Sequence, residues 1–126
     1  MIIYAPVSLG ELIDKITILQ IKKEKMSGDK LRNVEKELNY LNKICNELDI
    51  QIELRFYAEL KIINITLWEI EDQIRLKENK QEFDNEFIEL ARSIYRQNDK
   101  RASIKKEINY QYSSNLIEEK FYSNFN

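Results

Sequence analysis

The 126-residue chain has no histidine, and it contains only two glycines, one proline and one cysteine. Without histidine, an imidazole cannot serve as a general base, as a metal ligand or as a switch near neutral pH. A single cysteine cannot form a disulfide within the chain, which is typical of proteins from a reducing cytoplasm. Because glycine and proline interrupt helices, their scarcity predicts long helices.

A strong charge of one sign is also missing. Twenty Lys and Arg residues face 22 Asp and Glu residues, which leaves a formal net charge of −2. The whole chain is therefore not attracted to nucleic acid or to anionic lipid, and we interpret its one basic run, RSIYRQNDKRASIKK, as a solvated helix face. No apolar run is long enough to span a bilayer, and the start, MIIYAPVSLGELI, lacks the basic region of a signal peptide. We expect a cytoplasmic protein without a membrane or nucleic-acid partner.

Apolar residues recur at helical spacing along most of the chain, which predicts a single all-α domain over residues 1–126. Its expected form is a set of antiparallel helical hairpins that build a four-helix-bundle-like or coiled-coil-like domain. The expected helices cover residues 8–27, 29–48, 52–78 and 84–112, and a tail covers residues 113–126. Ser8 and Glu11 have the spacing of a capping box. Gly28 is expected to end the first helix as its C′ residue, and Asp29 is expected to cap the second.

The first helix is apolar on two sides. Leu12, Ile16 and Leu19 share one face, whereas Ile18 and Ile21 lie on another. A helix with two apolar sides needs two partner surfaces. The third and fourth helices are the longest, so their hairpin is expected to project beyond the first hairpin and to leave apolar residues uncovered. A homo-oligomer supplies that cover, and the leading hypothesis is a non-enzymatic module that oligomerises or binds a protein partner.

Three acids, Glu69, Glu71 and Asp72, cluster along the stretch TLWEIEDQIRLKE. Wound on a helix at 100° per residue, they separate: Glu69 points to water, and Glu71 and Asp72 lie beside Arg75. One helix therefore cannot chelate a metal ion with these three side chains.

The fourth helix carries an anomaly in its apolar seam. Asn98, Arg101 and Lys105 occupy positions where the periodicity predicts hydrophobic residues. Buried cations need compensation, and in antiparallel hairpins these two lie toward the level of Glu11 and Asp14 in the first helix. Three interpretations stay open: a structural polar layer, an anion pocket, and a magnesium site built from acids on two helices. The candidates for anion binding are Asn98, Arg101 and Lys105, and those for the polar layer are Asn64, Glu71, Asp72, Arg75, Glu11 and Asp14. No residue is assigned as a metal ligand, and no cofactor is expected.

Four segments, PVSLGELIDKITILQIKKEKM, LWEIEDQIR, YRQNDKRASIKKEIN and LIEEKFY, resemble an uncharacterised family of short bacterial and phage-borne proteins, a domain of unknown function. The resemblance implies a compact helical domain and no known activity. The first helix alone also resembles the opening helix of all-helical chorismate mutases, whose pocket is rich in Arg and Lys. The alternative to an interaction module is therefore a small helical enzyme or sensor for an anionic metabolite or nucleotide, with or without magnesium.

Overall fold

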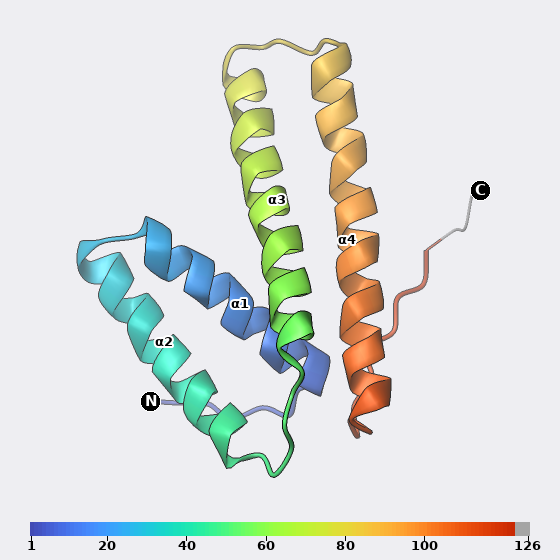
Figure 1. Ribbon diagram of the computed structural model, residues 1–126. Helices are drawn as coiled ribbons and strands as arrows, with labels where there is room; N and C mark the ends of the chain where they lie inside the picture. Colours follow the sequence, from blue (N-terminus) through green and yellow to red (C-terminus); the bar gives the residue numbers. More distant parts are fainter. Residues whose placement is uncertain (123–126) are drawn as a thin grey trace.

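The computed structural model describes residues 1–122, and within that range the chain forms four α-helices and no strand (Figure 1). The helices are α1 (Leu9–Lys25), α2 (Gly28–Glu47), α3 (Leu54–Asn79) and α4 (Asn85–Gln111). The prediction of an all-α, bundle-like fold is confirmed. The observed helix ends differ from the expected ones by one or two residues. The last four residues of the expected tail, 123–126, lie outside the described residues.

The helix ends follow the capping residues only in part. Ser8 caps α1, because its Oγ accepts a hydrogen bond of 3.2 Å from the Glu11 N–H. The Glu11 carboxylate does not complete the capping box within α1; it accepts from Lys105 on α4. At the start of α4, Asp84 Oδ1 accepts from the Phe87 N–H at 3.0 Å.

The turn between α1 and α2 corrects two expectations. The first helix ends at Lys25 with Met26 as its cap, so Gly28 is not its C′ residue. Gly28 instead begins α2 with φ +62°, a conformation that glycine adopts at little cost. Asp29 lies inside the first turn of α2, where it pairs with Arg32, and therefore does not cap that helix.

The first helix lies at the centre of the fold. Among residues 1–122, α1 packs against all three other helices, whereas α2 packs mainly against α1 and also touches α3, where Cys45 Sγ lies 3.3 Å from Tyr57 Oη. The other long contact is the antiparallel hairpin of α3 and α4, which extends well beyond α1 and α2 (Figure 1). The two apolar sides of α1 are thus both covered within one chain: α2 covers one side, and the α3–α4 hairpin covers the other.

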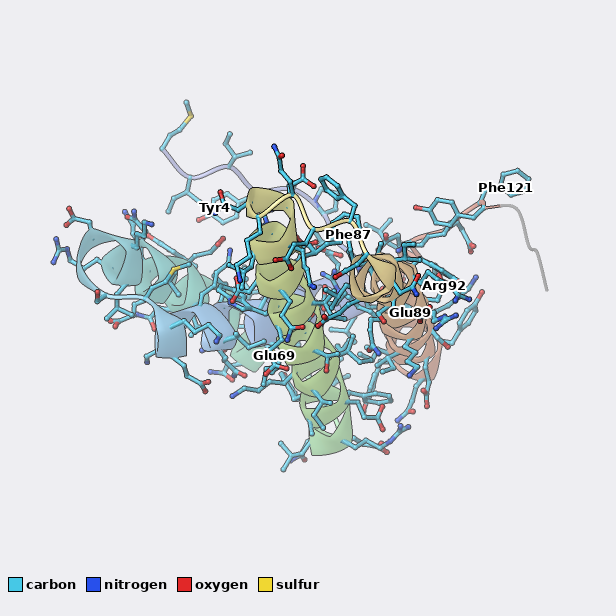
Figure 2. All side chains as sticks on the ribbon, turned by 90° about the horizontal axis from the view of Figure 1, so that it is seen from above. Tyr4, Glu69, Phe87, Glu89, Arg92 and Phe121 are labelled. Carbon is cyan, nitrogen blue, oxygen red and sulfur yellow. The ribbon has the colours of Figure 1, made fainter. Side chains whose placement is uncertain are left out.

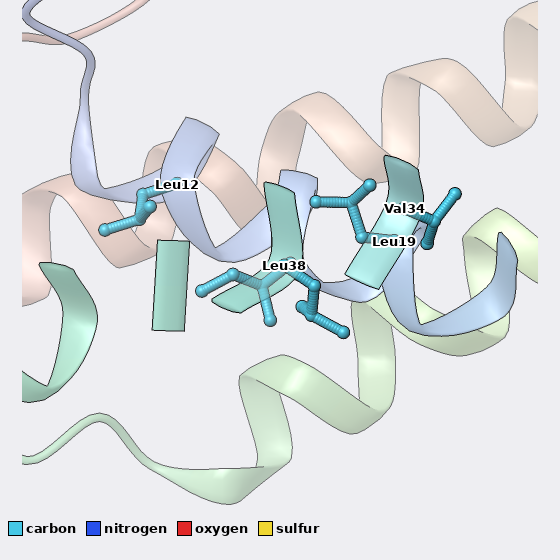
Figure 3. Close-up of a cluster of buried hydrophobic side chains, with 5 residues drawn as sticks. Leu12, Leu19, Val34 and Leu38 are labelled. Atoms are coloured by element: carbon cyan, nitrogen blue, oxygen red, sulfur yellow. The ribbon is translucent and has the colours of Figure 1, made fainter. Parts of the chain in front are cut away.

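Two clusters of buried side chains correspond to these two sides. The first joins α1 to α2 and consists of Leu12, Ile16, Leu19, Val34 and Leu38 (Figure 3). The second joins α1 to the hairpin and consists of Ile13, Phe56, Leu60 and Ile108, each fully buried. A buried side chain of this size contributes about 1.5–3 kcal/mol to stability relative to its exposed state.

The seam between α3 and α4 is less well covered beyond α1. Near α1, Phe56 and Leu60 are fully buried. Farther along the hairpin, Ile70 is still buried, but Leu67, Ile74 and Ile94 are only half-buried. Two helices alone cannot enclose the residues between them, so burial decreases where the third helix ends. No helix within residues 1–122 has both the length and the apolar character needed to cross a membrane.

Candidate functional site

A buried carboxylate joins three helices at the base of the hairpin. Asp14 on α1 has 0% of its surface exposed, and the side chain of Arg101 on α4 is 28% exposed. Arg101 Nε donates to both Asp14 oxygens at 3.0 Å, and Nη2 donates to Oδ2. Asn64 Nδ2, on α3, donates to Oδ1 at 2.9 Å. Asp14 therefore has both a countercharge and enough donors to offset the loss of hydration on burial.

Thr17, one turn after Asp14 on α1, completes this arrangement. Its hydroxyl donates to the Asp14 main-chain oxygen at 2.7 Å and accepts from Asn64 Nδ2 at 3.0 Å. Both Thr17 and Asn64 are buried. Their hydrogen bonds fix the level of α3 against α1, which one apolar contact could not do.

Lys105, one turn beyond Arg101, is enclosed by carboxylates. Its Nζ donates to Glu11 at 2.6 Å and to Glu118 at 2.8 Å, and it lies 4.0 Å from Asp14. Burial disfavours the charged ammonium, but the hydrogen bonds to Glu11 and Glu118 outweigh it, so the pKa of Lys105 lies above its ordinary value. The hydrogen bonds to Asp14 likewise raise the pKa of Arg101.

The charges of this network nearly balance. Two cations, Arg101 and Lys105, face three carboxylates, Asp14, Glu11 and Glu118. The network thus carries one net negative charge, and an anion that bound Lys105 would have to displace Glu11 or Glu118. This balance favours the polar-layer interpretation over a joint anion pocket of Arg101 and Lys105.

Next to this network, α1 and α4 approach each other unusually closely. The Gly10 N–H donates to Asn109 Oδ1 at 2.7 Å, and Asn109 is 1% exposed. A Cβ atom on Gly10 would lie 2.5 Å from the main-chain oxygen of Lys105. Only glycine therefore allows the two backbones to meet here without a shift.

The segment after α4 folds back onto the helices. Ser114 Oγ accepts from the Leu9 N–H at 3.1 Å, and Glu118 and Glu119 pair with Lys105 and Lys106. Phe121, by contrast, lies clear of the helices (Figure 2). The part of the tail up to Glu119 is thus docked, and it supplies one carboxylate of the network.

We expect Glu118→Gln to loosen this docked segment more than Glu119→Gln does. Lys105 holds the pKa of Glu118 below its usual value, so the ion pair contributes its full stability above the unfolded pKa of about 4.3. That contribution is lost as the pH falls through the folded-state pKa. Glu118 is half-exposed, so the effect on global stability stays below about 1 kcal/mol.

Hydrogen exchange of amides after Tyr112 at pH 7 measures the effect. Glu119→Gln is the matched control, because Glu119 pairs with the exposed Lys106 outside the network. Equal exchange rates in the two variants would contradict the role of Glu118.

A cleft of about 540 Å³ opens between α1, α3 and α4, directly beyond the network. It is lined by Ile18, Ile21, Asn64, Leu67, Trp68, Glu71, Asp72, Arg75, Ile94, Asn98 and Arg101. Arg75 Nε donates to Glu71 at 3.3 Å, in agreement with the sequence, but Asp72 forms no ion pair within residues 1–122. Glu69 is exposed on α3, outside the cleft (Figure 2).

The predicted site residues therefore fall into two places. Glu11, Asp14, Asn64, Arg101 and Lys105 meet in the buried network, whereas Glu71, Asp72, Arg75 and Asn98 line the cleft wall. Asn64 and Arg101 belong to both. No three Asp, Glu or Cys side chains within residues 1–122 are grouped closely enough to hold a metal ion.

The comparison with protein families agrees with the resemblance that the sequence motifs show. The model of a family of unknown function, DUF6165, matches residues 3–125. The chain belongs to this family. No curated protein and no solved structure matches it.

In this member of the DUF6165 family, the sequence did not predict Thr17 and Glu118 of the network or Gly10 and Asn109 beside it. Thr17, Asn109 and Glu118 look like ordinary surface polar residues, and only the fold shows their partners. Gly10 did leave a signal, because a glycine inside an apolar helical pattern often has a packing reason.

Proposed function

We propose that this DUF6165 chain is a helical interaction module that pairs with a second copy of itself through the projecting part of the α3–α4 hairpin. One stripe on α4 carries the proposal. Ile88, Tyr95, Ala102 and Asn109 recur every seven residues, so they lie along one side of the helix.

Exposure along this stripe changes from one end to the other. Asn109 is 1% exposed because α1 covers it, and Ala102 is half-buried. Tyr95 and Ile88, which lie beyond α1, are 56% and 50% exposed. Ala91, between them on the same side, is exposed as well. The same helix face is thus a packing surface at its base and an uncovered apolar surface toward its tip.

A second copy is the partner that matches this surface best. A twofold interface places the same patch on both sides, so the apolar stripe of one hairpin meets an equal stripe on the other. The half-buried seam residue Ile74, which lies outside the cleft, supports this reading, since a second hairpin would supply the layer that α1 supplies at the base.

The charges of the network favour a structural role over catalysis or anion binding. Its cations are already paired with carboxylates, and its net charge is negative. An enzyme or sensor for an anionic metabolite or nucleotide therefore receives less support than an interaction module.

We expect light scattering after size exclusion to show a dimer at micromolar concentration and Tyr95→Glu to yield a monomer. A buried Glu on this stripe would lose its hydration without a partner, which opposes association. Because Tyr95 is exposed in the single chain, the variant should keep its Tm at low protein concentration.

Ile62→Glu is the matched control, since Ile62 is 66% exposed on α3 but is not part of the stripe. This variant should still dimerise. A monomeric parent protein at 100 micromolar, or equal loss of association in both variants, would show that the stripe is not the interface.

A further inference from the structure

The cleft has the composition of a ligand site rather than of a packing defect. Its volume of about 540 Å³ lies within the range of small-molecule sites, roughly 300–1,000 Å³. Ile18, Leu67 and Ile94 supply apolar walls, and Trp68 adds an aromatic surface. A few polar groups converge at the base, and such a mixture is typical of binding sites.

Arg101 lines this cleft, and Asp14 binds only one edge of its guanidinium group. A guanidinium can bind two carboxylates, one along the Nε–Nη2 edge and one along the Nη1–Nη2 edge. Asp14 occupies the Nε–Nη2 edge. Nη1 has no hydrogen-bond partner within residues 1–122, and the side chain is 28% exposed and lines the cleft. Asp14 thus holds Arg101 rigid, with its second edge available to a carboxylate.

Asn98 lies one turn from Arg101 on the same side of α4 and also lines the cleft. Its amide can donate a second hydrogen bond to the same carboxylate. Asn98 makes no side-chain hydrogen bond to residues 1–122, so a ligand would not have to break one.

The charges that line the cleft disfavour a simple polyanion. Arg101 is neutralised by Asp14, and Arg75 by Glu71, while Asp72 has no cationic partner within residues 1–122. A phosphate group would gain one guanidinium edge and meet this excess negative charge. A ligand with a carboxylate at one end and an ammonium group at the other would satisfy both ends of the cleft.

The distance between the two ends sets the size of the ligand. Asn64 and Arg101 both donate to Asp14, so they lie at one level of the hairpin. Glu71 follows Asn64 by seven residues, or about 10 Å along α3 at 1.5 Å per residue. Asn98 precedes Arg101 by three residues on the antiparallel α4, so a carboxylate held by both lies about 2 Å nearer the tip, which shortens the gap to roughly 8 Å. One extended residue spans about 3.5 Å, so an amino acid is too short and a dipeptide fits.

We propose that the cleft binds a zwitterionic molecule of dipeptide size with an apolar body. Its carboxylate lies on Arg101 and Asn98, its ammonium group lies near Glu71 and Asp72, and its apolar part packs on Leu67, Ile94 and Trp68. This site is separate from the proposed self-association stripe, because neither Ile88 nor Tyr95 lines the cleft.

Calorimetric titration with leucyl-leucine, its N-acetyl form and its C-terminal amide tests the proposal. We expect the dipeptide to bind and each blocked form to bind about tenfold or more weakly, since each lacks one charged hydrogen-bonding end. Absence of heat from leucyl-leucine at millimolar concentration would overturn the proposal. So would equal affinity for the blocked forms, or binding of inorganic phosphate or ATP in place of the dipeptide.

Two variants with matched controls locate the site. Asp72→Asn should weaken dipeptide binding about tenfold, whereas Glu69→Gln, three residues earlier and outside the cleft, should not change it. Asn98→Ala should also weaken binding, and Gln97→Ala should not. Neither Asp72 nor Asn98 belongs to the buried network, so these variants should fold.

Binding that is unchanged in both cleft variants would place the dipeptide elsewhere and overturn the proposal. The same titration on Tyr95→Glu separates this proposal from self-association, because a monomeric variant should still bind the dipeptide.

Discussion

Asp14→Ala is expected to lower the free energy of unfolding by about 3–5 kcal/mol, the largest effect of any single substitution in the network. Asp14 is fully buried, and it accepts hydrogen bonds from both Arg101 and Asn64. Its removal leaves a mostly buried guanidinium without a countercharge, and the lost hydration of that cation is no longer offset. Urea denaturation followed by far-UV circular dichroism measures the change.

Two comparisons distinguish the loss of a countercharge from the loss of packing. Glu11→Gln removes a carboxylate that is one-third exposed, so it should cost about 1 kcal/mol or less. The double variant Asp14→Leu with Arg101→Met removes both charges and should recover much of the stability, as replaced buried ion pairs often do. An Asp14→Ala protein within 1 kcal/mol of the parent would mean that the pair is not buried in solution.

Gly10→Ala should destabilise the protein by about 1–3 kcal/mol, although alanine is the better helix former. Alanine gains about 1 kcal/mol over glycine in a helix interior. At this position, however, the new Cβ would lie 2.5 Å from the main-chain oxygen of Lys105, and neither backbone can move alone. Separating α1 from α4 strains the Gly10–Asn109 hydrogen bond and the ion pairs beside it, so overpacking outweighs propensity.

Gly28→Ala is the natural comparison, because it makes the same change at the only other glycine. Nothing lies within 4 Å of a Cβ there, and the cost comes only from φ +62°, roughly 1–2 kcal/mol. The unfolding temperature should therefore fall in both variants. Only Gly10→Ala should also increase the rate of amide hydrogen exchange around Lys105. If that rate does not increase, the close approach of α1 and α4 is contradicted.

The helices could be predicted because apolar residues recur at helical spacing within each of them. Leu12, Ile16 and Leu19 give the face of α1 that meets α2, and Phe56, Leu60 and Ile63 give the buried face of α3. The turn at Gly28 was not predictable in detail. A glycine that follows one helix and precedes another fits either end, and only the backbone angle shows which one it serves.

The candidate site was half predictable for a related reason. Arg101 and Lys105 interrupt an apolar seam, and the hairpin geometry indicated their level opposite Asp14 and Glu11. The contact of Glu118 with Lys105 could not be predicted, because Glu118 lies beyond the last helix. There, no helical spacing of apolar residues shows where the chain runs. Of the two acids beside Arg75, only Glu71 pairs with it, because both compete for one cation and Glu71 has the favourable spacing of four residues.

The apolar second side of α1 suggested a partner copy, and the structure shows that this cover comes from the same chain. The evidence for self-association therefore rests on Tyr95 and Ile88 beyond α1, not on α1 itself.

Because α1 lies at the centre of the fold, its two sides are covered at different times during synthesis. The first hairpin needs only neighbouring segments, so α1 and α2 can pair while the chain is still being synthesised. The other side of α1 is completed only by α4, about 90 positions later, at an elongation rate of about 5–20 residues per second. During those seconds Asp14 lacks Arg101 and Ile13 lacks Ile108. A chain that stops before Arg101 would keep a charged, half-apolar helix surface exposed, and chaperones and proteases could recognise such a surface as incomplete.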